Sequence, residues 1–68
     1  MRDIKRIYPT MCHIAEKWQD KCPDWRLGQL MVNFFSAYGD PYYWEDDGFI
    51  ERFDEYIATT FYINGKED

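Results

Sequence analysis

A chain of 68 residues with a formal net charge of −5 makes one small domain. Its acidity disfavours phosphate backbones and anionic membrane surfaces, because both are bound through Lys and Arg. No stretch approaches the roughly 18 apolar residues of a membrane span, and the amino terminus lacks an apolar signal core. We therefore expect a cytoplasmic protein that binds neither nucleic acid nor membrane.

The core of this domain has to be aromatic. A chain of this size buries only about 60% of its unfolded surface. Phe, Tyr and Trp make up 21% of the sequence, whereas Leu occurs only at Leu27 and Leu30. Large rings bury about 150–250 Å² each, so a few of them build a core. A surplus of such rings also favours a homodimer or a partner interface.

Residues 3–21 have the apolar spacing of a helix. One stripe, at steps of 3, 4, 3 and 4, consists of Ile4, Ile7, Met11, Ile14 and Trp18. Asp3 is suited to cap the first turn. Pro9 requires a kink or a short opening turn at 3–8, because proline removes a helical hydrogen bond. The helix ends before Cys22, since the residue preceding Pro23 is pushed out of the α region.

Residues 24–38 predict a second helix. Its wide apolar face consists of Leu27, Leu30, Met31, Phe34, Phe35 and Tyr38. Asp24 is the expected N-cap, and Gly39 stands where a left-handed C-terminal cap belongs. Gly28 costs roughly 1 kcal/mol inside a helix, which close approach of the first helix would explain.

Residues 46–62 predict a third helix that follows the turn at Asp40-Pro41. Its apolar stripe consists of Phe49, Ile50, Phe53, Tyr56, Ile57 and Phe61. Residues 45–47 are acidic, as the positive end of a helix dipole favours. Asn64-Gly65 is expected to end this helix. Alternatively, residues 59–63 form a short extended segment instead of helix, because they are β-branched or aromatic.

These patterns predict an all-α fold over residues 1–68, a small three-helix bundle with an aromatic-rich core. We expect no catalytic residue, no metal site and no cofactor. Cys12, His13 and Cys22 do not complete a tetrahedral zinc site, and the adjacent Cys12 and His13 diverge on a helix. The acidic run 40–47 lacks the ligand order of a calcium loop. Two buried free thiols and a surface histidine are the expected structure, with a Cys12–Cys22 bridge in a secreted chain as the alternative.

The charge is uneven along the chain. Residues 1–30 carry six Lys/Arg and four Asp/Glu (+2), and residues 31–68 carry two and nine (−7). Within the third helix, one outward stripe consists of Asp47, Glu51, Asp54 and Glu55. This stripe is either a solvated face or a surface that docks on a basic groove of a partner. A nucleic-acid contact would have to use the scattered cations Arg2, Lys5, Arg6, Lys17 and Lys21, and we disfavour it.

Three consecutive aromatic residues, Tyr42, Tyr43 and Trp44, precede the acidic helix. Successive side chains in a loop diverge, so the three rings cannot all point inward. They are either the hot spot of a partner interface or a lid on the small core.

The blocks Pro23-Asp24-Trp25-Arg26-Leu27-Gly28-Gln29-Leu30 and Asp40-Pro41-Tyr42-Tyr43-Trp44-Glu45-Asp46-Asp47, with Trp18 before them, resemble a known group. It consists of short phage and prophage proteins of Gram-positive bacteria with the pattern W…PDxRxGQL…DPFYxEDD. The region around Trp18 and Pro23-Asp24 also resembles the helical YihD-type proteins. Neither resemblance implies a catalytic residue. The phage setting implies a small accessory protein, in the host cytoplasm, that blocks a host or defence protein.

We therefore predict a non-enzymatic protein-binding module that acts as an inhibitor or regulator. Its predicted partner-binding residues are Tyr42, Tyr43, Trp44, Asp47, Glu51, Asp54 and Glu55. The alternative is a structural homodimer or small assembly component without a regulatory role.

Overall fold

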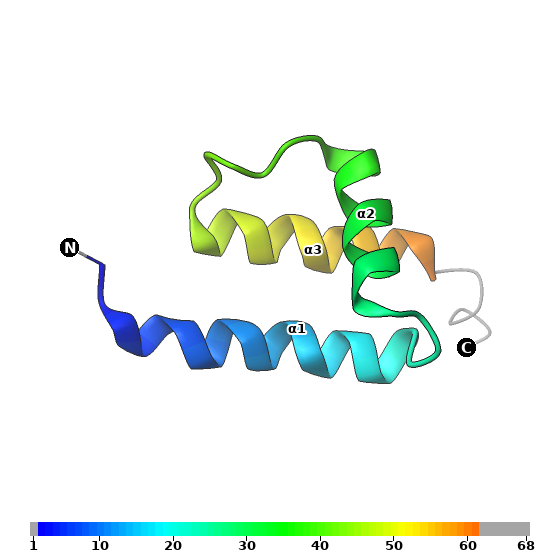
Figure 1. The fold of residues 1–68 in the computed structure, drawn as a ribbon, viewed down its shortest axis with the longest axis horizontal. Helices are drawn as coiled ribbons and strands as arrows, with labels where there is room; N and C mark the ends of the chain where they lie inside the picture. Colours follow the sequence, from blue (N-terminus) through cyan, green and yellow to red (C-terminus); the bar gives the residue numbers. More distant parts are fainter. Residues whose placement is uncertain (1, 62–68) are drawn as a thin grey trace.

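The computed structural model describes residues 2–61, which form three α-helices and a 3-10 turn. The elements are η1 (Ile4–Arg6), α1 (Ile7–Lys21), α2 (Leu27–Tyr38) and α3 (Asp46–Thr60). α1 and α3 lie side by side and run in the same direction, and α2 crosses α3 steeply (Figure 1). Within residues 2–61 there is no strand, and the backbone of α2 packs on α3 but not on α1. The prediction of a small all-α three-helix bundle is confirmed.

The first helix opens with a short turn, as Pro9 requires. The Asp3 carboxylate accepts a hydrogen bond from the backbone N–H of Lys5 at 2.9 Å and caps η1. α1 then begins at Ile7, so that Pro9 lies in its first turn, where the missing N–H has no helical partner to lose. The helix ends at Lys21, in agreement with the predicted stop before Pro23.

The second helix begins three residues later than predicted. Its N-cap is Arg26 rather than Asp24, and α2 starts at Leu27. The reason is a turn at residues 22–25, in which the N–H of Trp25 donates to the carbonyl of Cys22 at 3.0 Å. The Trp25 carbonyl in turn accepts a hydrogen bond from the indole Nε1 of Trp18 at 2.9 Å. These two contacts hold Trp25 outside the helix, and the Pro-Asp pair belongs to the turn.

The other helix ends largely match the predictions. Gly39 has φ +96° and donates its N–H to the Phe35 carbonyl at 2.7 Å, as a left-handed cap does. α3 begins with Asp46 and Asp47 in its first turn. It reaches Thr60, so residues 59 and 60 are helical rather than extended. Residue 62 of the predicted helix, residue 63 of the extended alternative and the Asn64-Gly65 stop lie outside the described residues.

The core is built around one ring, Phe34. The buried residues are Ile14, Cys22, Leu30, Phe34, Phe53, Tyr56 and Ile57. The rings of six aromatic residues lie 5.2–5.9 Å from that of Phe34, namely Phe35, Tyr38, Trp44, Phe49, Phe53 and Tyr56. All six pairs are tilted or edge-to-face, the geometries that aromatic quadrupoles favour. The aromatic-rich core is therefore present in the described part of the chain.

Two details of the predicted packing are wrong. The stripe of the first helix is buried only in its second half, because Ile14 is buried whereas Ile4, Ile7 and Met11 are exposed. Gly28 does not mark a close approach of the first helix, since a Cβ placed there would meet nothing within 4 Å in the described part. Both follow from the steep crossing of α2, which leaves the start of α1 uncovered.

Candidate protein-binding site

The loop between α2 and α3 is held by hydrogen bonds that its backbone N–H groups donate. Gly39 caps α2, and the Asp40 carboxylate accepts a hydrogen bond from the N–H of Tyr42 at 3.0 Å. The N–H of Trp44 donates to the carbonyl of Pro41 at 3.0 Å and closes a turn. The loop is therefore short, capped and internally hydrogen-bonded, which limits the conformations it can adopt.

Trp44 is the residue of the loop that packs inward. Its ring lies 5.9 Å from that of Phe34 and 5.8 Å from that of Phe49. The guanidinium of Arg52 lies 4.6 Å from the centre of the Trp44 ring, within cation–π distance. Trp44 is half-buried by these contacts and anchors the loop to α2 and α3.

Tyr42 and Tyr43 point away from the core. Their side chains are among the most exposed large residues, at 77% and 88%. The two rings contact each other edge-to-face, with centroids 4.7 Å apart and planes at 85°. Of the two readings of the aromatic run, the lid therefore describes Trp44, whereas Tyr42 and Tyr43 are displayed to solvent.

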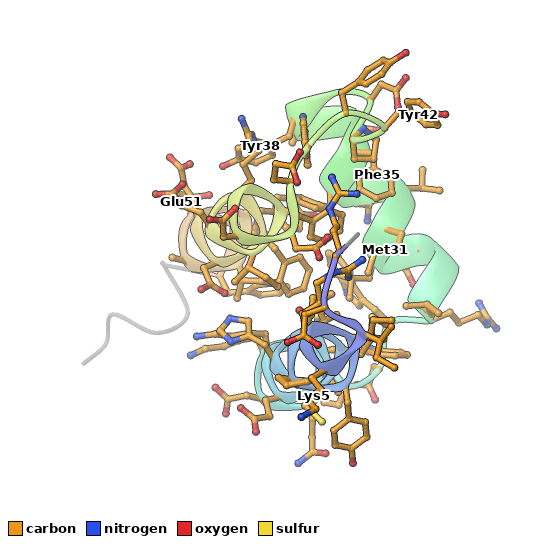
Figure 2. All side chains as sticks on the ribbon, turned by 90° about the vertical axis from the view of Figure 1, so that its left-hand side faces the viewer. Lys5, Met31, Phe35, Tyr38, Tyr42 and Glu51 are labelled. Carbon is orange, nitrogen blue, oxygen red and sulfur yellow. The ribbon has the colours of Figure 1, made fainter. Side chains whose placement is uncertain are left out.

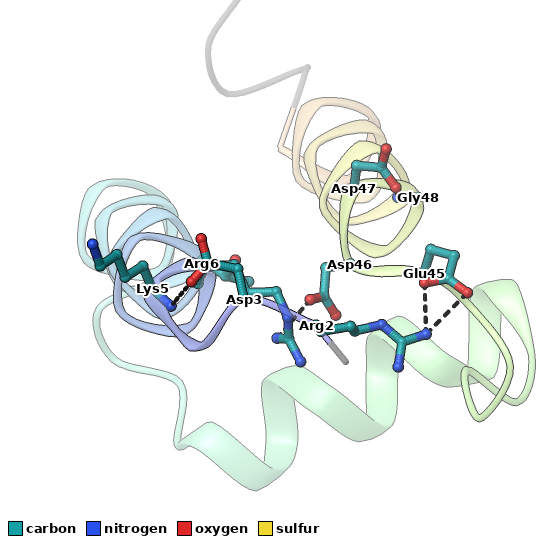
Figure 3. A network of polar contacts seen from close by, with 9 residues as sticks. Arg2, Asp3, Lys5, Arg6, Glu45, Asp46, Asp47 and Gly48 are labelled. Carbon is teal, nitrogen blue, oxygen red and sulfur yellow. Dashed lines mark hydrogen bonds and ion pairs between the residues drawn. The ribbon is translucent and has the colours of Figure 1, made fainter.

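Much of the acidic charge near the start of α3 is neutralised from within the molecule. The Arg2 guanidinium binds Glu45 at 2.9 Å, and that of Arg6 binds Asp46 at 2.8 Å (Figure 3). The carboxylate of Glu45, by its hydrogen bond and its charge, raises the pKa of Arg2. These two ion pairs place the basic amino-terminal segment against the acidic start of α3.

Asp54 is also engaged within the fold. Its Oδ1 lies 2.7 Å from Nε2 of His13, which connects the middle of α1 to α3. Asp54 and His13 are both half-buried, so neither is the fully outward residue that the sequence predicts. The rest of the predicted stripe remains outward, because Asp47, Glu51 and Glu55 are exposed.

The surface beside the stripe is shallowly hollowed. One open groove of about 480 Å³ is lined by Asp47, Gly48, Ile50, Glu51 and Asp54. A second, of about 410 Å³, runs between α1 and α3 and is lined by Arg6, Pro9, Thr10, His13, Asp46, Asp47 and Ile50. At the far end of the stripe, burial raises the pKa of Tyr38, and the charge and hydrogen bond of Glu55 raise it further. The stripe is thus an open acidic surface beside two shallow grooves.

The predicted partner-binding residues do not form one continuous surface. Tyr42 and Glu51 lie on opposite sides of the molecule when it is viewed along α1 (Figure 2). A flat partner cannot cover both at once. The aromatic pair and the acidic stripe are therefore two separate candidate surfaces, and Trp44 lies beneath the first of them.

The two cysteines are free thiols. Cys12 is half-buried, Cys22 is buried, and within residues 2–61 neither forms a disulfide. Burial raises the pKa of the Cys22 thiol, as expected of a structural cysteine. Within the same residues, no cluster of three or more His, Cys, Asp or Glu side chains could hold a metal ion.

Sequence reasoning did not find the cations that bind the acidic helix. Arg2, Arg6 and His13 contact carboxylates some forty residues away, and Arg52 contacts Trp44. The opposite charge of the two halves was the available signal, since a basic first segment beside an acidic third one predicts such pairs. These pairs also occupy two of the five cations considered for nucleic-acid contact.

No protein-family model, curated protein or solved structure matches this chain. None of the helices in the described residues is long and apolar enough to cross a membrane.

Proposed function

We propose that this protein is a small, non-enzymatic protein-binding module that recognises its partner through Tyr42 and Tyr43. The observation that supports this is the display of two tyrosine rings on a constrained loop. Tyr is enriched among the residues that dominate binding energies, and it loses little conformational entropy on binding. The capped loop, anchored by Trp44, lowers the cost of ordering the site further.

The proposed role is that of an inhibitor or regulator, encoded by a phage or prophage, that blocks a host or defence protein in the host cytoplasm. The resemblance in the blocks 23–30 and 40–47 supports the setting. A small chain acts most simply by covering the surface of another protein.

A basic groove on the partner is the second part of the proposal. Asp47 and Glu51 are exposed on α3 and, within residues 2–61, have no ion-pair partner. Unneutralised carboxylates of this kind steer a basic surface toward the molecule and raise the association rate. Because the stripe faces away from Tyr42, the partner has to be concave or to wrap around α3.

The experiment starts with the tagged protein in lysate of a Gram-positive host, where mass spectrometry identifies what it retains. Affinity for the purified partner is then measured by titration calorimetry. Tyr42→Ala/Tyr43→Ala should weaken binding by at least about 30-fold, the size of one hot spot. Val32→Ala is the control, because Val32 is 63% exposed on α2, outside the loop, and should leave the affinity unchanged.

A second pair of variants tests the acidic stripe. Glu51→Lys should slow association and reduce its salt dependence, whereas Glu16→Lys, an equally exposed reversal on α1, should change it less. Wild-type affinity in the double tyrosine variant would show that this loop is not the binding site. A loss of affinity in Glu51→Lys alone would show that the partner binds the acidic stripe and not the tyrosine loop.

A further inference from the structure

The start of the first helix carries an apolar row that nothing in the described structure covers. The row consists of Ile4, Ile7, Tyr8 and Met11. Their spacings of 3, 1 and 3 place them on one face, and Ile4 and Tyr8 are 75% and 79% exposed. The same stripe continues into Ile14 and Trp18, which the rest of the fold covers. The row is therefore an apolar helix face, of the kind usually buried in a core, that no described part of the chain covers.

We propose that a second copy of this chain covers the row, with the first helices of the two copies packed antiparallel across a two-fold axis. In this pairing Ile4 of one copy meets Met11 of the other, and the Ile7 and Tyr8 side chains meet at the centre. Each copy contributes the same surface, as an isologous interface requires. The steps of 3 and 4 between Ile4, Ile7, Met11 and Ile14 are those of a helix–helix seam.

The exposed area of the row fits such a dimer. Its four side chains expose roughly 450 Å² of surface per copy. A standard interface buries about 800 Å² per partner, of which about 60% is apolar. The row thus supplies the apolar part, and the flanking Lys5, Thr10 and Ala15 supply a rim. This area is at the lower end of stable interfaces, so a weak, concentration-dependent dimer is expected.

The charge distribution selects this face over others for self-association. Arg6 of η1 and Thr10 and His13 of α1 face α3 and its carboxylates. Ile7 and Met11 each follow one of these positions by one residue, about 100° around the helix. Pairing across the row therefore joins the half of the chain with the smaller net charge, +2 rather than −7, and keeps the two acidic helices apart. Lys5 points away from both other helices, toward the side where the second copy would lie (Figure 2).

The antiparallel arrangement has its own electrostatic reason. Parallel pairing would bring the amino ends of the two first helices together, with Arg2 and Lys5 of each copy. In the antiparallel register, Lys5 of one copy lies at the level of Thr10 of the other instead of beside the second Lys5. This association involves neither Tyr42 nor Tyr43, so it stands or falls independently of the proposed partner site.

Sedimentation equilibrium of the purified chain tests the dimer without any partner. The apparent mass should rise with concentration from 8.3 kDa toward twice that value. Ile4→Glu/Met11→Glu should weaken dimerisation more than about tenfold, because it buries two facing pairs of like charges. Tyr8→Glu is a second disrupting variant at the most exposed position of the row. Circular dichroism confirms that each variant is folded.

The matched control is Val32→Glu, since Val32 is an equally exposed apolar residue on α2. It should leave the dissociation constant within about twofold of wild type. A wild-type chain that remains monomeric into the millimolar range would overturn the proposal and would mean that the row belongs to a different protein. A dimer that survives the row variants but is lost in Val32→Glu would overturn it equally.

Discussion

The two ends of this molecule are held together by different forces. Where α2 crosses α3, the fully buried ring of Phe34 is surrounded by six others. Where the amino-terminal segment meets the start of α3, the contacts are the surface ion pairs Arg2–Glu45 and Arg6–Asp46. Apolar burial is worth about 25 cal/mol per Å², whereas an exposed ion pair contributes about 0–1 kcal/mol. The aromatic end therefore supplies the stability, and the charged end sets the position of the first helix.

Removing the central ring should have the largest effect. Phe34→Ala is expected to reduce the free energy of unfolding by about 3–5 kcal/mol, because it leaves a cavity where six rings met. A domain of this size has little more than that in total, so the variant should be largely unfolded at 25 °C. Urea denaturation followed by circular dichroism measures the change, with Val32→Ala as an exposed control that should stay within about 0.5 kcal/mol. A loss below about 1 kcal/mol would contradict the central role of Phe34.

Gly28, inside α2, and Gly39, which caps it, should respond to substitution in opposite directions. Gly39→Ala should destabilise by about 1–2 kcal/mol, because an L side chain is strained at φ +96°. Gly28→Ala should stabilise by up to about 1 kcal/mol, since a Cβ there meets nothing in the described part and alanine favours the helix. Thermal unfolding of the two variants side by side tests this. Destabilisation by Gly28→Ala would reveal a close contact at the start of α2.

The charged end should give the smallest effect. A double-mutant cycle on Arg6→Ala and Asp46→Ala should yield a coupling free energy of about 0.2–1 kcal/mol. In 1 M salt the screening length falls to about 3 Å, and the coupling should shrink toward zero. Urea titrations of wild type and the three variants at low and high salt provide the measurement. A coupling above about 2 kcal/mol would show that the two ends contribute comparably.

Local patterns in the sequence predict most of the fold. The structure has a helix at each of the three apolar periodicities, Asp3 as a cap and Gly39 with a positive φ at the end of α2. Each of these features depends on neighbours within one or two turns. The start of α2 could not be predicted in this way. Asp24 has the local properties of a cap, but Trp25 is drawn out of the helix by Trp18, seven residues earlier. A tertiary hydrogen bond overrides the local preference there.

The sequence predicts which residues belong to the candidate surfaces, but not where these residues lie in the fold. Spacing alone puts Asp54 on the outer stripe, because a helical wheel does not show that His13 lies across from it. Likewise, an aromatic run does not show which ring will turn inward. Trp44 does so because Phe49 and Arg52 of the following helix receive it. Such choices depend on how whole helices cross, which no local pattern encodes.

The parallel arrangement of α1 and α3 has a consequence for how this chain folds. The contacts between them join residues that are far apart in sequence, with separations of 43 for Arg2–Glu45 and 41 for His13–Asp54. A helical hairpin would gain its contacts by closing a short loop. Here the intervening forty residues, including all of α2, have to be placed before the first helix meets its neighbour, at a larger cost in chain entropy. Folding should accordingly be slower than in an up-and-down bundle of equal length, with α2 and α3 forming first and α1 docking last.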